Sequence, residues 1–284
     1  MSVAGRAFTK MSGSGNDFVF LDARAAGARD PLEHAEWIRA ACARGTGIGA
    51  DGVVFLGPPR GPGAVAEVRY YNSDGGRAAL CGNATLCATR LTAELGLARP
   101  DGFALDTDSG RLPARMRDGR PEIDLGTVVD VRLHVEAIAT MAEERRIGFA
   151  LVGVPHLVVL VEDVADVDVG ARGAALRRHA AVAPAGANAN FVSPAPDGRG
   201  WRIRTFERGV EAETLACGTG AVASGILLAA WRLAAADSVV ELETRSGLRL
   251  GVTPRAQADG KWQPSLAGEG RVVFRGELGE LPAG

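Results

Sequence analysis

Short alternating runs of apolar and polar residues fill much of this 284-residue chain, and glycine, proline or aspartate bounds most of them. Such alternation is typical of strands that bury one face against a core. The pattern predicts strands at 50–56, 64–71, 103–107, 122–125, 131–137, 146–150, 157–161, 202–206, 239–244, 248–253 and 271–275. We therefore expect a fold in which sheets dominate.

Apolar residues spaced three and four positions apart predict fewer helices. Positions 32, 35, 38 and 42 are apolar, so a helix is expected over 31–43, with Asp30 as its N-cap and Pro31 as its first residue. A shorter helix is expected over 176–181.

Two further helices are expected to begin beside a cysteine. The first runs from just after Cys81 to about residue 95, where Gly96 stops it. The second runs from near Gly218 to about residue 235 and is apolar on nearly every face. A helix without a polar face must be enclosed on all sides, so this helix should lie inside a sheet.

A repeated motif divides the chain into two halves. Leu80-Cys81-Gly82-Asn83 matches Ala216-Cys217-Gly218-Thr219-Gly220. An apolar-Arg-x-aromatic-polar stretch precedes each cysteine, as Val68-Arg69-Tyr70-Tyr71-Asn72 and as Ile203-Arg204-Thr205-Phe206-Glu207. The two halves are therefore expected to be copies of one unit.

These patterns together predict an α+β fold of two pseudo-symmetric domains. Each domain is expected to be a curved, mostly antiparallel sheet or barrel wrapped around a central helix. The boundary is expected near Gly126, which gives an N-terminal domain over 1–125 with Cys81 and a C-terminal domain over 126–268 with Cys217. The final strand, about 269–284, is a candidate for return to the first domain.

A cysteine at a helix start has useful chemistry. The first N–H groups of a helix are unpaired and the helix dipole is positive there, so a thiol is pushed toward thiolate and a carboxylate can bind nearby. Two such thiols facing one carbon provide a base on one side and an acid on the other. This arrangement would remove an α-hydrogen and return a proton to the opposite face.

Bulk composition excludes several classes of protein. A net charge of −2 gives no basic surface for nucleic acid or for a membrane. No apolar stretch is long enough to span a bilayer and the start lacks a secretory pattern, so a cytoplasmic location is expected. Thiols stay reduced there. Cys42 and Cys87 fall inside helices and are expected in the core.

Cofactor motifs fit poorly. A pyridoxal enzyme needs a lysine, and the chain has only Lys10 and Lys261, neither in a glycine-rich pocket. The segment 47–52 matches a dinucleotide fingerprint, but it follows a helix and precedes a strand, which is the reverse of the required order. A second match opens the helix after Cys217, but the residues before it are too polar for a buried strand. We expect neither a cofactor nor a metal.

Several polar residues near the motifs are candidates for ligand contacts. Glu207 could hold an ammonium and Arg208 a carboxylate, although a solvated ion pair is the ordinary explanation. His156 could help to deprotonate a thiol, or could simply be a histidine satisfied by the backbone. The turn-forming residues are Asn16, Asn72 and Asn188, and a binding role is favoured because two of them align with the repeat.

These motifs resemble those of the pyridoxal-independent diaminopimelate epimerases. The matching residues, which span almost the whole chain in the expected order, are Gly13-x-Gly15-Asn16-Asp17-Phe18, the segment 47–52, Asn72-x-Asp74-Gly75, Cys81-Gly82-Asn83, Glu207-Arg208-Gly209 and Glu213-Thr214-x-Ala216-Cys217-Gly218-Thr219-Gly220. The resemblance implies interconversion of LL- and meso-diaminopimelate without a cofactor, in lysine and peptidoglycan precursor biosynthesis. It also implies a homodimer.

The resemblance also implies roles for individual residues. Cys81 and Cys217 would be the acid and the base. The reacting carboxylate would be held by Gly82, Asn83, Gly218 and Thr219. The amines and the distal carboxylate would be held by Asn16, Asn72, Asn188, Glu207 and Arg208.

Two features depart from the family pattern. Gly153-Val154-Pro155-His156 has valine where the family has asparagine, which removes a polar contact. The segment 208–213 is one residue longer than is common. A related racemase for another amino acid, such as histidine or a proline derivative, is therefore an alternative. A non-catalytic amino-acid binder is a third, disfavoured because both thiols are present.

Overall fold

The computed structural model describes residues 5–26 and 29–280 of the chain. Two compact units emerge. Unit 1 contains the chain up to Ile123 and again from Gly268 onwards, and unit 2 contains Asp124–Ala267. Strands and helices occur in both units, so the predicted α+β class is confirmed.

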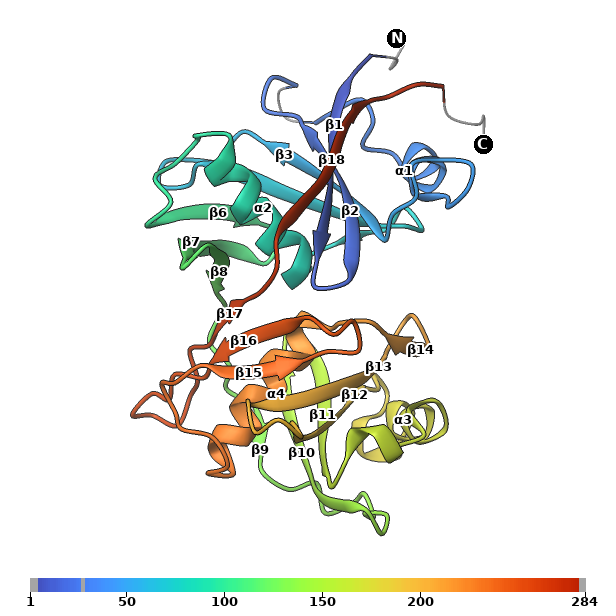
Figure 1. Ribbon diagram of the computed structural model, residues 1–284, viewed down its shortest axis with the longest axis vertical. Coiled ribbons are helices and arrows are strands. Elements are labelled where there is room, and N and C mark those ends of the chain that lie inside the picture. Colours follow the sequence, from blue (N-terminus) through green and yellow to red (C-terminus); the bar gives the residue numbers. More distant parts are fainter. Residues whose placement is uncertain (1–4, 27–28, 281–284) are drawn as a thin grey trace. The chain divides into compact units, whose positions relative to one another are not determined.

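The described residues of unit 1 form two helices, the first seven strands, all but the last residue of the eighth strand, and the final strand of the chain (Figure 1). Its elements are β1 (Ala7–Gly13), β2 (Asn16–Asp22), α1 (Ala35–Cys42), β3 (Gly52–Gly57), β4 (Ala66–Asn72), β5 (Arg77–Ala78), α2 (Gly82–Glu94), β6 (Phe103–Thr107), β7 (Gly110–Arg117), β8 (Arg120–Asp124) and β18 (Arg271–Glu277). The last of these, β18, pairs antiparallel with β1, so the C-terminal strand lies in the sheet of unit 1.

Unit 2 repeats this series. Its elements are β9 (Val131–Arg132), β10 (Glu144–Val152), β11 (Val154–Val161), η1 (Val164–Asp166), α3 (Val169–Arg177), η2 (Ala180–Val182), β12 (Asn188–Pro194), β13 (Trp201–Glu207), β14 (Ala212–Thr214), α4 (Gly218–Ala230), β15 (Val240–Glu243), β16 (Arg249–Thr253) and β17 (Ser265–Ala267). The sheet continues antiparallel from β15 through β16 to β17.

Strand pairing shows the internal repeat directly. In unit 1, β2–β3 and β4–β6 are parallel, whereas β1–β2, β3–β4, β4–β5 and β6–β7 are antiparallel. In unit 2, β11–β12 and β13–β15 are parallel, whereas β10–β11, β12–β13, β13–β14 and β15–β16 are antiparallel. The helices α1 and α3 occupy the same connection in the two units, as do α2 and α4. The repeat predicted from the cysteine motifs is therefore a repeat of topology.

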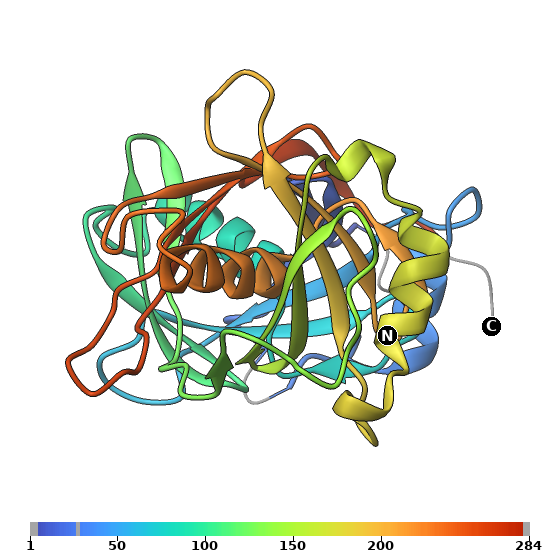
Figure 2. The same cartoon turned by 90° about the horizontal axis from the view of Figure 1, so that it is seen from below.

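The apolar helix α4 is enclosed by the strands of its own unit, as predicted (Figure 2). Val222 and Ile226 are fully buried. Glycines allow close packing, because a Cβ at Gly225 would lie 2.7 Å from Cγ1 of Val252 and one at Gly148 would lie 2.8 Å from Cδ2 of Leu227. The helix and its sheet therefore approach within a distance that larger residues would forbid.

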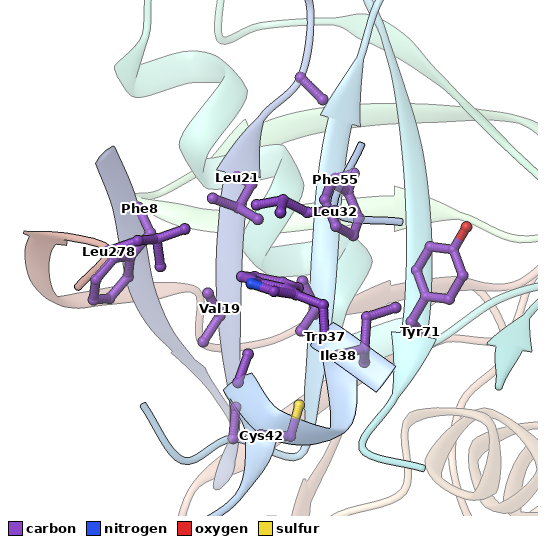
Figure 3. Packing of buried hydrophobic residues seen from close by; sticks show 14 residues of the cluster. Phe8, Val19, Leu21, Leu32, Trp37, Ile38, Cys42, Phe55, Tyr71 and Leu278 are labelled. Carbon is purple, nitrogen blue, oxygen red and sulfur yellow. The ribbon is translucent and has the colours of Figure 1, made fainter. Parts of the chain in front are cut away.

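A hydrophobic cluster in unit 1 packs α1 against the sheet. Trp37 and Ile38 point from α1 toward Phe55 of β3 and Tyr71 of β4 (Figure 3). The ring centroids of Phe55 and Tyr71 are 5.8 Å apart in an edge-to-face arrangement. Such aromatic pairs stabilise a core beyond their buried area.

Helix α1 begins later than the sequence predicts. Asp30 pairs with Arg6, but its Oδ1 also accepts from the backbone N–H of Leu32 at 3.0 Å. Glu33 pairs with Arg69, and its Oε1 accepts from the backbone N–H of Asp30 at 2.8 Å. These contacts close a turn that precedes the helix. His34 is the N-cap instead, and its Nδ1 accepts from the backbone N–H of Trp37 at 3.3 Å. The predicted cap therefore closes a separate turn, and the helix begins after it, at Ala35.

Other predicted bounds also differ from the structure. The helix expected over 176–181 is wrong, because α3 (Val169–Arg177) ends where it should continue and only the short η2 (Ala180–Val182) follows. The helix after Cys217 ends earlier than expected, at Ala230, because Arg232 adopts a left-handed φ of 60°. The strand expected over 131–137 is only the two-residue β9. The sequence pattern missed β1, β2, β7 and β12, together with the short strands β5, β14 and β17. Three of the longer ones, β1, β2 and β12, carry more than one buried residue in succession and so do not show simple alternation.

Candidate active site

Each unit presents a cysteine at the start of its central helix. Cys81 is the N-cap of α2 with φ −128° and ψ 115°, and Cys217 is the N-cap of α4 with φ −127° and ψ 109°. Both helices are 13 residues long. Helices usually begin at serine, threonine, aspartate or asparagine, so helix stability does not explain a cysteine at both starts.

In unit 1, three polar side chains form a relay toward the start of α2. Asn83, in the first turn of α2, is buried, and its Nδ2 donates to Oδ1 of Asn16 at 2.7 Å. Nδ2 of Asn16 in turn donates to Oδ2 of Asp51 at 3.0 Å. The carboxylate only accepts, so it dictates which end of each amide faces its neighbour. Asp51 therefore sets the polarity of both asparagines.

Ion pairs hold Asp51 itself in place. Its Oδ1 accepts from Arg44 at 2.8 Å, and Arg44 also pairs with Asp17 at 2.6 Å. Lys10 pairs with Asp17 at 2.7 Å and donates to the carbonyl of Gly49. The segment 47–52, which matches a nucleotide-binding fingerprint in sequence, therefore holds the side chain of Asn16 in place through Asp51.

The two remaining predicted residues of unit 1 lie at the ends of elements. Gly82 is buried as the first residue of α2. Asn72 ends β4 with an exposed side chain, and its backbone N–H and carbonyl bond to Gly76 and Gly75, each at 2.9 Å. Asn72 is therefore accessible to a ligand from solvent.

In unit 2, Asn188 and the strand end of β13 lie together. Oδ1 of Asn188 accepts from the backbone N–H of Arg208 at 2.7 Å, and Nη1 of Arg208 donates to the carbonyl of Ala185 at 3.1 Å. Oε2 of Glu207 accepts from the hydroxyl of Thr214 at 3.0 Å. Burial raises the pKa of Glu207, although the Thr214 bond opposes this shift.

The longer segment after β13 forms a four-residue turn. Arg208 and Glu211 are its first and last residues, and Glu211 adopts a left-handed φ of 58°. The Glu211 carboxylate accepts from Arg177 and Arg178, each at 2.9 Å. These bonds hold the longer turn in place, and Glu207 remains at the end of β13, paired with Ala212 of β14.

The start of α4 carries the other predicted residues of unit 2. Gly218 is buried as the first residue of the helix, and Oγ1 of Thr219 lies 3.6 Å from Sγ of Cys217. Thr219 takes the place that Asn83 has in α2, and Val154 takes the place that Asn16 has at the start of its strand. The amide relay of unit 1 therefore has no counterpart built from the same residues in unit 2.

His156 lies in β11 and is fully buried. Burial, together with the positive charge of Arg208, lowers the pKa of His156 to about 3, so the imidazole is neutral at physiological pH. Its Nδ1 lies 3.3 Å from Nδ2 of Asn190. Within the described part of the chain, its Nε2 has no hydrogen-bond partner.

The other two cysteines are buried as predicted. Burial raises the pKa of Cys42 to about 11. Burial also raises the pKa of Cys87 well above its ordinary value, with a smaller contribution from the nearby Cys81. Neither thiol ionises at neutral pH, so neither competes with the helix-start cysteines.

Three supporting residues were not predicted: Asp51, Asn190 and Thr205. Asp51 lies in the segment 47–52, which is part of the family resemblance but gave Asp51 no role of its own, and the other two face inward from strands. A buried polar residue two positions from a predicted ligand, as Asn190 is from Asn188, was the available signal.

The described residues form neither a metal site nor a membrane-spanning helix. Over residues 5–26 and 29–280, His, Cys, Asp and Glu nowhere gather in threes that could hold a metal ion. None of the helices in those same ranges has the length and apolarity that crossing a bilayer requires. Both lysines are engaged, Lys10 with Asp17 and Lys261 with Asp259 at 2.7 Å.

Comparison with known proteins identifies the family. The sequence model described as diaminopimelate epimerase matches residues 8–131 and 148–266. The chain belongs to the diaminopimelate epimerase family. It is 50% identical over 279 residues to the diaminopimelate epimerase of Gemmatimonas aurantiaca, covering 96% of this chain and 99% of that one. The enzyme of Aquifex aeolicus is 37% identical over 225 residues, covering 78% and 80%.

Solved structures support the fold of this epimerase family member. A phenazine biosynthesis protein of the PhzF family from Bacillus anthracis has a TM-score of 0.74 at 17% identity, covering 98% of this chain and 99% of that one. A hydroxyproline epimerase from Agrobacterium vitis, with bound trans-4-hydroxy-L-proline, has a TM-score of 0.67 at 18% identity, covering 96% and 92%. At these identities the likeness shows a shared fold.

Proposed function

We propose that this chain is a cofactor-independent isomerase that interconverts LL- and meso-diaminopimelate, supplying lysine and peptidoglycan precursors. The observation that carries the proposal is the pair of equivalent helix-start cysteines, Cys81 and Cys217. They have matching dihedral angles in two units of one topology. Membership of the epimerase family supports the same conclusion.

The proposed chemistry uses one thiol as a base and the other as an acid. A thiolate removes the α-hydrogen, and the opposite thiol delivers a proton to the other face of the same carbon, which inverts it. The N–H groups at the starts of α2 and α4 hold the α-carboxylate and stabilise the negative charge that develops on it. We assign this role to the first turns, with residues Gly82, Asn83, Gly218 and Thr219.

The distal end of the substrate carries a second ammonium and a second carboxylate. We assign the carboxylate to Arg208, whose guanidinium has a fork geometry suited to it. Glu207 would receive an ammonium, which would favour the ionised form that burial otherwise opposes. The remaining polar contacts are assigned to Asn16, Asn72 and Asn188. His156 is a candidate thiol activator.

The units, the assembly and the location complete the proposal. We propose that units 1 and 2 act as two functional domains that each supply one thiol. We also propose a homodimer in the cytoplasm, with neither nucleic acid nor membrane as a partner.

The direct experiment follows the α-carbon. The purified, reduced protein is incubated with LL-diaminopimelate in heavy water without added cofactor, and deuteration and stereochemistry are monitored by NMR and chiral chromatography. We expect formation of the meso isomer with deuterium at the inverted centre. Absence of both exchange and inversion would refute the proposed function.

The thiol variants test the assignment of the acid and the base. Cys81→Ala and Cys217→Ala should each abolish inversion, whereas Cys42→Ala, which removes a core thiol, should retain it. Circular dichroism would establish that each variant is folded. Full turnover by either helix-start variant would refute the two-thiol scheme.

A related racemase is the second candidate, favoured by Val154 where the family has asparagine. The hydroxyproline epimerase of the same fold acts on a substrate with a single carboxylate, as its bound ligand shows. Arg208 favours a substrate with two carboxylates. Exchange in heavy water with proline or histidine, but not with diaminopimelate, would select the racemase.

A further inference from the structure

A buried amide in unit 2 connects His156 to the first turn of α4. Asn190 of β12 is fully buried and lies two residues after Asn188, which is the register partner of His156. A Cβ at Gly220 would lie 2.2 Å from Oδ1 of Asn190 and 3.3 Å from Cβ of Cys217. The amide therefore packs directly against the turn that carries the thiol.

The neighbours of Asn190 fix the orientation of its amide. The backbone carbonyl of Leu157 can only accept, so the atom 2.9 Å from it must be Nδ2. The hydroxyl of Thr205 lies 3.0 Å from Oδ1 and donates to it. Both contacts require the same orientation. The second N–H of Nδ2 is left to face Nδ1 of His156.

This orientation determines the tautomer of His156. Because an N–H donor faces Nδ1 at 3.3 Å, Nδ1 must carry a lone pair, and the ring proton must be on Nε2. That Nε2–H is buried and, among the described residues, has no acceptor. A buried donor without an acceptor costs free energy, so a polar atom in this position points to a bound group.

We propose that Asn190 is a positioning residue that holds His156 as the Nε2–H tautomer, so that His156 donates a hydrogen bond to an anion in the active site. This inference rests on the proposed function. In this role His156 stabilises a thiolate or a substrate carboxylate and does not accept the proton of a thiol, because its basic nitrogen is occupied by Asn190.

Nitrogen-15 NMR of the ring tests the tautomer directly. The protein contains four histidines, and the signals of His156 are assigned by their loss in His156→Gln. We expect an unprotonated Nδ1 and a protonated Nε2 throughout the neutral range. A protonated Nδ1, or a ring that titrates between about pH 5 and 8, would overturn the proposal.

Variants test the part played by Asn190. Asn190→Asp places an acceptor opposite Nδ1, so the proton should move from Nε2 to Nδ1. Asn190→Leu, which avoids a carboxylate facing the Leu157 carbonyl, should give a mixture of tautomers. Thr205→Val is the matched control, because Leu157 still fixes the amide, and it should keep the native tautomer. An unchanged tautomer in both Asn190 variants would overturn the role of Asn190.

The anion is identified by the Nε2–H signal. A shift as the ligand-free protein is taken through thiol ionisation assigns a thiolate, and a shift only on adding diaminopimelate assigns the carboxylate. No shift in either arm would overturn the donor role. Loss of the donor in Asn190→Asp should lower the rate of α-hydrogen exchange roughly 100-fold. The tautomer is measured without turnover, so its failure is separate from failure of the proposed function.

Discussion

Single side chains decide the polarity of the site in unit 1, and Asp51 is the clearest case. Its carboxylate orients Asn16 and, through Asn16, the buried amide of Asn83. Asp51→Asn should let both amides turn over and should lower kcat/KM roughly tenfold, the effect of one misdirected hydrogen bond. The matched control is Asp17→Asn, which shares Arg44 but leaves Asn16 untouched. Initial rates give kcat/KM for both variants. An equal fall in kcat/KM would show that the ion pairs with Arg44, and not the orientation of the amides, determine the activity.

The valine at position 154 is a second effect at this scale. Val154 is half-buried at the start of β11. This position corresponds, in the internal repeat, to that of Asn16 at the start of β2. Val154→Asn should lower KM for diaminopimelate by restoring a polar contact, with kcat little changed. Competition with proline or histidine checks the specificity. A lower KM for those amino acids, but not for diaminopimelate, would favour the related racemase.

At the scale of elements, close packing positions the thiol of unit 2. Gly225 lies about two turns after the start of α4 and packs against Val252 of β16, so this contact fixes the helix on its sheet. Gly225→Val would force a shift in that contact and should destabilise the protein by about 1–3 kcal/mol. Thermal unfolding followed by circular dichroism measures this loss. Gly126→Ala is the matched comparison, because nothing lies within 4 Å of a Cβ there and its φ is not left-handed, so its stability should match that of the parent.

Sequence reasoning recovered the elements whose signal is local. The apolar pattern of α4 and the repeated cysteine motifs predicted the central helices, because both signals depend only on residues that are close together in the sequence. The predicted start of α1 is wrong because the capping contacts of Asp30 and Glu33 close a separate turn before the helix. The supports of the site, Asp51 and Asn190, were missed for a different reason. Their roles depend on hydrogen bonds across strands.

At the scale of the whole molecule, each unit contains a hydrophobic cluster built from its own residues. Glu33 of unit 1 is buried and bonds to Arg69 and to the hydroxyl of Tyr71 at 3.0 Å. Burial alone would raise the pKa of Glu33, but the bonds from Arg69 outweigh it and the net pKa is lowered. The stability that this ion pair contributes is therefore present at neutral pH and is lost as the pH falls through the lowered pKa.

Glu33→Gln should destabilise unit 1 by about 3 kcal/mol at pH 7, because it leaves the Arg69 charge buried without its partner. Hydrogen exchange should show the faster opening in α1 and β3, with little change in α4. The difference between the variant and the parent should shrink at low pH, where Glu33 is protonated. Equal destabilisation of both units would contradict an effect confined to unit 1.

The central claim is that two different thiols act on one stereocentre, and the early partition of deuterium tests it most directly. LL-diaminopimelate is converted in heavy water and stopped after a small fraction has reacted. If the second thiol supplies the proton, the meso product should carry solvent deuterium at the inverted carbon while the remaining LL substrate stays unlabelled. Product that retains the substrate hydrogen at that carbon would contradict the account, because a single group would then have removed and returned the same proton.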